Sequence, residues 1–273
     1  MTNERVLEEL SEWENSLQIY KANDFEMIYD SWMKQGFEKI NPSIQANFFE
    51  KLDNILFHTH AYLQGSNSQN EARERIITTS RIFNPHISHI HEMNSLKIEQ
   101  LTYLAQQHIS KGRLYSLVQG GITGTGGIVL LGVDFPLVMV MNLRVVQLIA
   151  LTFGHEVNHP YEMMLSLKVY HAATLPKRLQ KQAWDELVKE LETDQAYLYE
   201  GNDALTNHSW LDQPLKQASK SLFILMARKK IFQGIPILSI GIGAYYNYQL
   251  TRQVANFALR FYQKRYILAT EKV

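Results

Sequence analysis

The sequence predicts an all-α protein folded as a multi-helix bundle, and three observations support this fold class. Apolar residues recur at three- and four-residue spacing along most of the chain, which is the period of an amphipathic helix. Alternating apolar and polar runs, which are typical of strands, are almost absent, and only residues 235–242 are ambiguous. Prolines and glycines stand between the periodic segments, where helices begin and end.

The first element, residues 1–30, is predicted to be an N-terminal amphipathic helix. Apolar side chains from Val6 to Tyr20 recur every three or four residues, with glutamates on the opposite side. This start is acidic and lacks the apolar run of a signal peptide, so export is not expected. The chain has no cysteine, which fits a reducing compartment. We therefore expect a cytoplasmic location, with peripheral attachment to the inner face of the cell membrane as a further expectation.

The next helices are delimited by prolines and polar clusters. Asn41-Pro42 indicates a helix start, and residues 65–71, GSNSQNE, indicate a loop. Asn84-Pro85 marks another break, after which helical spacing resumes over residues 96–109. We treat residues 1–273 as one helical domain, because no repeat or clear linker divides them.

The most unusual segment, residues 114–133, is glycine-rich and contains no charged side chain. Its glycines are at positions 120, 121, 124, 126, 127 and 132. Gly120 and Gly124 have the spacing that lets two helices approach closely. The run lacks the Gly-Lys-Ser/Thr of a phosphate loop, so nucleotide binding is not indicated. Two glycine-rich apolar hairpins, residues 114–153 and 231–268, are therefore predicted to pack together in the core.

Asp134 directly precedes Phe135-Pro136 at the start of a predicted buried helix over residues 135–153. An aspartate in this position favours helix N-capping. The alternative is a buried ion pair, with Arg144 or with polar residues spaced four apart near the C-terminus. These polar residues are Arg252, Asn256 and Arg260.

Gly154 is expected to end the buried helix, since glycine readily adopts the left-handed conformation found after helix C-termini. Pro160 and Pro176 are expected to open the two following helices, because proline is favoured at the first helical position. The final helix is predicted over residues 247–268, with a stripe of apolar side chains along one side.

Two histidine motifs raise the question of a metal. His155, Glu156 and His159 form a literal H-E-x-x-H, the zinc-binding pattern of a metallopeptidase helix. Gly154 and Pro160 flank the motif, and a residue before proline is disfavoured in a helix, so we expect an inter-helix turn. The second motif is HISHIHE, with His86, His89, His91 and Glu92. It lacks complementary ligands at the usual spacing, so we expect no metal or other cofactor.

The charge balance bears on partners. Lys+Arg 27 against Asp+Glu 27 gives a net charge of +0, so no overall field favours nucleic acid. The two apolar segments reach the length of a membrane span, but polar residues and glycines dilute them. Their composition favours buried helices or contact with a membrane surface. The oligomeric state is not indicated.

The central and C-terminal segments resemble the EcsC family. The resembling positions are Gly120, Gly121, Gly124, Gly127, Asp134, Pro136, Leu143, Arg144, Ile149, Ala150, Phe153, Gly154, Pro160, Pro236, residues 241–244, Asn247, Ala258, Phe261, Tyr262 and Arg265. The resemblance runs in order from about residue 30 to residue 268 and is specific in these two blocks.

The resemblance implies a helical bacterial protein without an established biochemical activity or agreed catalytic residues. It also implies a link to an ABC transporter and to secretion. The expected function is that of an accessory factor at a membrane transport or secretion system, whose partner is the membrane surface or a transporter component. The alternatives are a zinc-dependent hydrolase acting through His155, Glu156 and His159, and a soluble interaction module.

Overall fold

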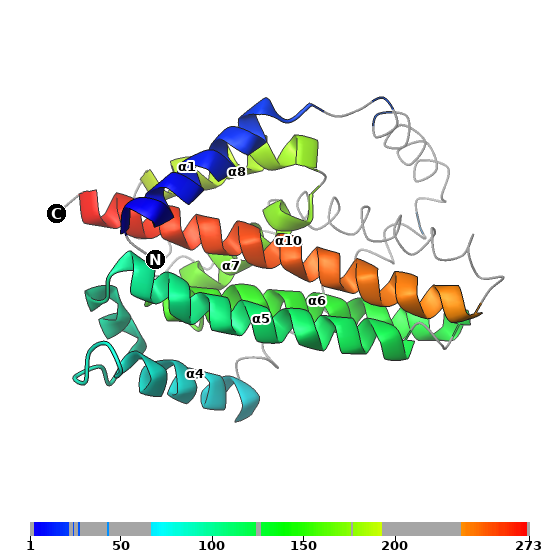
Figure 1. The fold of residues 1–273 in the computed structure, drawn as a ribbon, viewed down its shortest axis with the longest axis horizontal. Helices are drawn as coiled ribbons and strands as arrows, with labels where there is room; N and C mark the ends of the chain where they lie inside the picture. Colours follow the sequence, from blue (N-terminus) through cyan, green and yellow to red (C-terminus); the bar gives the residue numbers. More distant parts are fainter. Residues whose placement is uncertain are drawn as a thin grey trace.

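The computed structural model describes residues 3–21, 24, 27, 43, 67–123, 127–175, 177–192 and 236–271, and within these ranges every regular element is a helix (Figure 1). The all-α prediction is confirmed. The elements are α1 (Asn3–Ile19), α4 (Asn67–Ser80), the 3₁₀ helix η1 (Ile90–Ser95), α5 (Ile98–Thr123), α6 (Gly127–Thr152), α7 (Pro160–Thr174), α8 (Lys177–Glu192) and α10 (Pro236–Glu271).

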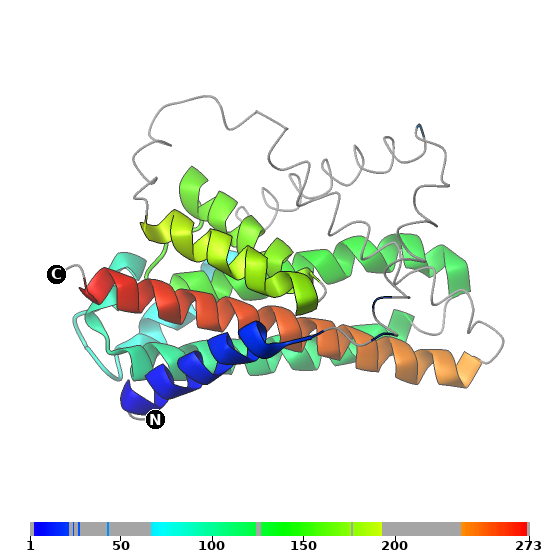
Figure 2. The same cartoon turned by 90° about the horizontal axis from the view of Figure 1, so that it is seen from above.

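The three long helices α5, α6 and α10 lie side by side along the long axis of the bundle (Figures 1 and 2). Helix α10 runs antiparallel to α5, since Gln263 Nε2 donates to Thr102 Oγ1 at 2.9 Å and Tyr266 Oη to the Leu96 carbonyl at 3.1 Å. At its other side, Gln253 Nε2 donates to the Ala173 carbonyl at the end of α7 at 2.7 Å. Helix α10 is therefore the central helix of the described fold and contacts neighbours on both sides.

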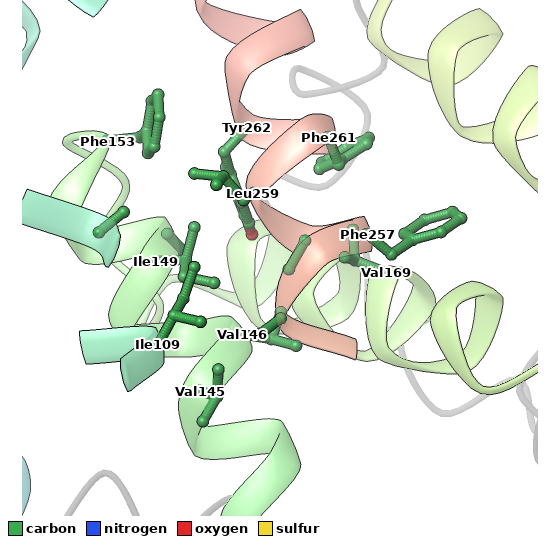
Figure 3. Close-up of a cluster of buried hydrophobic side chains, with 14 of the residues drawn as sticks. Ile109, Val145, Val146, Ile149, Phe153, Val169, Phe257, Leu259, Phe261 and Tyr262 are labelled. Carbon is green, nitrogen blue, oxygen red and sulfur yellow. The ribbon is translucent and has the colours of Figure 1, made fainter. Parts of the chain in front are cut away.

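The core is filled mainly by the apolar faces of these helices. Figure 3 shows the side chains where α6 and α10 meet, with Ile149 of α6 and Phe153, the residue that follows α6, beside Tyr262 of α10. All three are at most 1% exposed. Close packing of this kind is expected where helices are apolar on most sides, as α6 is.

Helices α1 and α8 cover α10 through aromatic side chains. The ring of Trp13 lies 4.7 Å from that of Trp184 and 5.5 Å from that of Phe257, edge to face in both cases. Val6 and Leu10 of α1 are buried in the same core. The predicted N-terminal amphipathic helix is present as α1, whose apolar face packs on the bundle, but it ends at Ile19 and does not continue to residue 30 as predicted.

The loop predicted over residues 65–71 is wrong within the described range, because α4 begins at Asn67. The polar composition there arises from exposure: Asn70 and Glu71 face solvent, whereas Ala72 and Ile76 bury the opposite side of the helix. Polar residues therefore mark a solvent-facing helical turn in this segment.

The prediction that Asp134 caps a helix is also wrong. Helix α6 runs without a break from Gly127 to Thr152, so Asp134 lies in its second turn. Pro136 cannot donate a hydrogen bond to the Gly132 carbonyl, but this loss removes one bond and does not end the helix. The alternative, an ion pair of Asp134, stays a prediction.

The helix ends around residue 154 agree with prediction. Gly154 has φ of 85° directly after α6, and α7 begins at Pro160. The last helix extends from Pro236 to Glu271, so from Pro236 onward the predicted second hairpin, 231–268, is one helix. No helix in the described part of the chain is both long enough and apolar enough to cross a membrane. The predictions for Asn41-Pro42, Gly124 and Pro176 lie outside the described residues.

Candidate functional site

A largely buried polar cluster lies where the turn between α6 and α7 meets α10, and it consists of His155, Glu162, Tyr262 and Arg265. The turn is built by two backbone bonds, from Gly154 N to the Leu151 carbonyl and from His155 N to the Ala150 carbonyl, both 3.0 Å long. This pair of bonds closes a helix C-terminus around a left-handed glycine. The chain then crosses the end of α6 and places the His155 ring 5.6 Å from that of Tyr262.

The strongest contact of the cluster is a two-pronged ion pair. Arg265 donates through both terminal nitrogens to Glu162, at 2.7 and 2.6 Å, and the two side chains are only 16% and 12% exposed. Burial opposes the charge of Arg265, but the hydrogen bond and charge of Glu162 outweigh it and raise the pKa of the guanidinium. The guanidinium and the carboxylate thus compensate each other in a largely buried place.

The neighbouring His155 and Tyr262 are neutral. Burial, followed by the charge of Arg265, holds the pKa of His155 well below its usual range, although its Nδ1 lies 3.8 Å from Glu162. Burial and the charge of Glu162 raise the pKa of Tyr262, whose hydroxyl has no hydrogen-bond partner in the described structure. The cluster thus holds one balanced ion pair beside two uncharged rings.

The residues of the H-E-x-x-H motif do not form a zinc-peptidase site. Glu156 is engaged by Arg73 of α4, with N–O distances of 2.5 and 2.7 Å. His159 is exposed and occupies the N-cap position of α7 with extended backbone, φ −73° and ψ 137°. Because the motif lies in a turn, its histidines do not lie one turn apart on a shared helix face, which is the arrangement of the metallopeptidase pattern. In the described parts of the chain no three His, Cys, Asp or Glu side chains gather to hold a metal.

The HISHIHE motif forms a surface loop that leads into η1. Glu92 accepts hydrogen bonds from the backbone N–H groups of Ser88 and His89, at 2.6 and 2.9 Å, and these bonds lower the pKa of its carboxyl. The rings of His89 and His91 stack with their centroids 5.5 Å apart. The acid of this motif therefore organises the start of a helix.

The cations proposed as partners of Asp134 have different surroundings. Arg260 donates to Glu9 of α1 at 3.2 Å and to Gln263 at 3.0 Å, whereas Arg252 is exposed. Arg144 is half-buried, and its charge is one of those that lower the pKa of His108. Of the polar residues predicted along the last helix, Arg252 thus faces solvent and Arg260 contacts α1.

The remaining predicted positions fall in two groups. Asn247 is 5% exposed in α10, and its Nδ2 lacks a hydrogen-bond partner among the described residues. The others lie on the helical backbone of α5 and α6 near the end of the bundle opposite the polar cluster (Figure 1). They are Gly120, Gly121, Gly127, Asp134 and Pro136.

Comparison with known proteins places the chain in a family. The model of the EcsC protein family matches residues 4–267. The chain belongs to the EcsC protein family. It is also 26% identical over 151 residues to the uncharacterized protein YdbA of Bacillus subtilis, in an alignment that covers 55% of this chain and 52% of YdbA. The match thus spans about half the length of that relative. No solved structure matches the chain.

Sequence reasoning did not select the residues that this EcsC-family chain brings together, namely Arg73, Glu162, Tyr262 and Arg265. Tyr262 and Arg265 are among the positions of the family resemblance, but nothing assigned them to a site. A usable signal exists: Arg265 lies one helical turn from Phe261 and two from Ala258, both fully buried, so its charge falls on the core face of α10. A charge on such a face requires a partner.

Proposed function

We propose that this EcsC-family protein is a non-catalytic accessory factor that attaches peripherally to the inner face of the cell membrane, at a transport or secretion system. The observation that carries the proposal is the meeting of uncharged helix ends at one end of the bundle. Family membership supports the link to transport, as the resemblance implies.

The uncharged end is defined here by residues 114–123 of α5, 127–133 of α6 and 236–251 of α10. None of these ranges contains Asp, Glu, Lys, Arg or His. The C-terminal end of α5 and the N-terminal ends of α6 and α10 lie together in both views (Figures 1 and 2). Two uncharged runs, separated by about a hundred residues of sequence, thus meet in space.

The composition of the uncharged end suits contact with a membrane or with membrane-embedded helices. Charged groups are costly to transfer out of water, so their absence removes the main barrier to such contact. Glycines allow close approach of helices, which drives association where the surrounding lipid is as apolar as the side chains. At the other end of the bundle, by contrast, ion pairs join α4 to the turn before α7, and α7 to α10.

Fractionation of cells tests the proposal. We expect the protein in the membrane fraction at low salt and in the supernatant after a carbonate wash, which releases peripheral proteins. Introducing charge with Ile122→Glu and Leu130→Glu should shift the protein to the soluble fraction. The matched control is Ile19→Glu, at a position in α1 that is 75% exposed, and it should leave the distribution unchanged.

Two results would contradict the proposal. Recovery of the wild-type protein entirely in the soluble fraction at low salt would instead favour a soluble interaction module. Equal release by the Ile19→Glu control and the paired variant would show that the uncharged end has no special part in attachment. Thermal unfolding of each variant establishes that a change in fractionation is not caused by unfolding.

A further inference from the structure

A cluster of basic side chains lies where α4, α5 and α6 pack against one another. We call it the basic cluster and define it as Arg75 of α4, His108 and Lys111 of α5, and Arg144 of α6. The charges that act on His108 are those of Lys111, Arg75 and Arg144, and no carboxylate of the described residues is among them. The four side chains are therefore close enough to interact, and every full charge in the cluster is positive.

The core beneath the basic cluster explains how three helices bring these side chains together. Arg75, His108 and Arg144 each directly precede a residue of one hydrophobic core cluster. These core residues are Ile76, Ile109 and Val145, of which Figure 3 labels the last two. Lys111 follows His108 by three positions, a spacing at which side chains are neighbours on a helix surface. Packing of the core thus holds the cations in place.

The basic cluster has no compensating carboxylate in the described structure. The side chains of Arg75 and Lys111 are exposed, and neither forms an ion pair with a described residue. The nearest acids on α4, Glu71 and Glu74, are exposed, and neither pairs with Arg75 or acts on His108. The positive charge at this place is therefore not cancelled by its own helix.

The sequence of α5 and α6 leads to the same conclusion. Residues 100–155 contain Lys111, Arg113 and Arg144 but a single carboxylate, that of Asp134. Asp134 lies about 15 Å from Arg144 along the axis of α6. Like charges that gather without a counter-charge oppose folding, so a bound anion would stabilise this arrangement.

We propose that the basic cluster binds a phosphate group through Arg75, Lys111 and Arg144. A guanidinium presents paired N–H donors that match two phosphate oxygens, and a lysine adds a compact positive charge. His108 is half-buried, and burial with the neighbouring charges lowers its pKa to about 4, so its neutral ring retains an N–H that can donate. Several cations attract the double charge of a phosphate more strongly than the single charge of a carboxylate.

The phosphate can belong to a lipid headgroup or to a soluble molecule, because both present the same chemistry. A nucleic acid fits less well, since the net charge of the chain is +0 and a cluster of this size is not a basic stripe. The basic cluster shares no residue with the uncharged end. The inference therefore stands independently of the peripheral attachment proposed above.

Titration of the purified full-length protein with inorganic pyrophosphate tests the inference. We expect pyrophosphate to raise the melting temperature more than sodium chloride of equal ionic strength does. Arg75→Gln and Lys111→Gln should each weaken binding about tenfold, because a hydrogen bond to a charged group contributes at least about that factor. The matched control is Lys97→Gln, which removes an exposed cation directly before α5 and should bind like the wild type.

The NMR signals of His108 provide a second readout at the site itself. Pyrophosphate should shift these signals and leave those of the exposed His91 in place. It should also raise the pKa of His108, because a nearby anion favours the protonated ring. Signals of His108 that do not respond while the protein binds pyrophosphate would place the anion elsewhere and overturn the inference.

Flotation with vesicles separates the two sources of phosphate. A lipid ligand predicts that the wild type prefers vesicles of phosphatidylcholine with phosphatidylglycerol to vesicles of phosphatidylcholine alone, and that Arg75→Gln/Lys111→Gln loses this preference. A soluble ligand predicts the response to pyrophosphate without such a preference. Either result supports the basic cluster as a phosphate site.

Three results would overturn the inference. They are a wild type that responds to neither pyrophosphate nor anionic vesicles, a response that Arg75→Gln and Lys111→Gln both retain, and a clear fall in the melting temperature of both variants without ligand. The last result would reveal a compensating partner within the protein, since removing one of several exposed like charges should leave the melting temperature unchanged or higher.

Discussion

The two ends of the bundle are stabilised in different ways. At one end, paired charges from four elements join α4, the turn between α6 and α7, α7 itself and α10. At the other end, α6 and α10, together with α5, carry no charged residue over 114–123, 127–133 and 236–251. Directional ion pairs join the elements of the first end, whereas the uncharged ranges of the second end contain no charged side chain that could form such pairs.

The two ends should therefore respond differently to substitution. A buried ion pair is sensitive to loss of one partner, because the remaining charge is left without compensation. An uncharged glycine-rich segment lacks that sensitivity and is free to contact apolar surroundings. The following predictions test this contrast, beginning with the largest expected effect.

Removal of Arg265 should produce the largest loss of stability. In Arg265→Ala the buried carboxylate of Glu162 loses its partner, and we expect the free energy of unfolding to fall by about 3–5 kcal/mol. The measurement is urea denaturation. Arg5→Ala is the control, since Arg5 is 65% exposed in a surface pair with Glu9 and should cost less than about 0.5 kcal/mol.

A double variant sharpens this test. Replacing both partners, as in Arg265→Met/Glu162→Met, removes the uncompensated charge and should recover much of the lost stability. A double variant no more stable than Arg265→Ala would show that the pair acts through something other than mutual compensation.

Acid should destabilise the protein through two partly buried histidines. Burial lowers the pKa of His171 to about 4, and burial together with the charges of Lys111, Arg75 and Arg144 lowers that of His108 to about 4. Their folded-state pKa values lie below the unfolded value of 6.5, so the unfolded state binds more protons between these limits. Stability is therefore constant above about pH 6.5 and falls as the pH drops toward 4.

The measurement is urea denaturation at pH values from about 7 to about 4.5. His171→Gln should show a shallower loss with acid than the wild type, while the exposed His91→Gln should follow it. Parallel acid profiles for the wild type and His171→Gln would be evidence against this origin of the pH dependence.

A side chain at Gly154 should strain the turn that positions the cluster. The backbone at this position has φ of 85°, and an added Cβ would lie 2.3 Å from Asn94 Oδ1. Gly154→Ala should therefore lower the free energy of unfolding by about 1–3 kcal/mol. Gly154→Asn should cost less, because asparagine tolerates the left-handed region better. Repeating Gly154→Ala in an Asn94→Ala background removes the clash, and a full recovery there would disprove backbone strain as the main cause.

The smallest expected effect is that of a substitution at the uncharged end, where the sign of the change in stability is informative. Alanine favours a helix over glycine by about 1 kcal/mol, so Gly120→Ala at an open position should stabilise α5. If the glycine permits close helix contact, as its spacing predicts, the added methyl group should lower the melting temperature instead. A rise in melting temperature would mean that this end is not closely packed at Gly120.

Much of the helical architecture was predictable from local chemistry. The 3.6-residue period determined the helical class. Gly154 marked the end of α6 and Pro160 the start of α7, because each acts through the backbone of neighbouring residues. The flanking residues also indicated that H-E-x-x-H lies in a turn, although the partner of Glu156, Arg73, lies 83 positions away and no local pattern identifies it.

The errors share a cause. Asp134 before Phe135-Pro136 has the local form of a helix start, and residues 65–71 have the composition of a loop, yet tertiary packing continues a helix through both within the described residues. Local preferences amount to about 1 kcal/mol or less for most residues and to about 3 kcal/mol for a proline inside a helix, such as Pro136. Burial of an apolar face along the helix outweighs them.

The amino-acid order alone thus determined that this protein is helical, where its uncharged segments lie and which glycine terminates α6, since these depend on contacts within a few residues. Only the tertiary structure decided that Glu162 pairs with Arg265, that Arg260 turns toward α1 and that the uncharged segments meet at one end. These outcomes depend on which helix faces meet, and that choice is made by burial over the whole bundle.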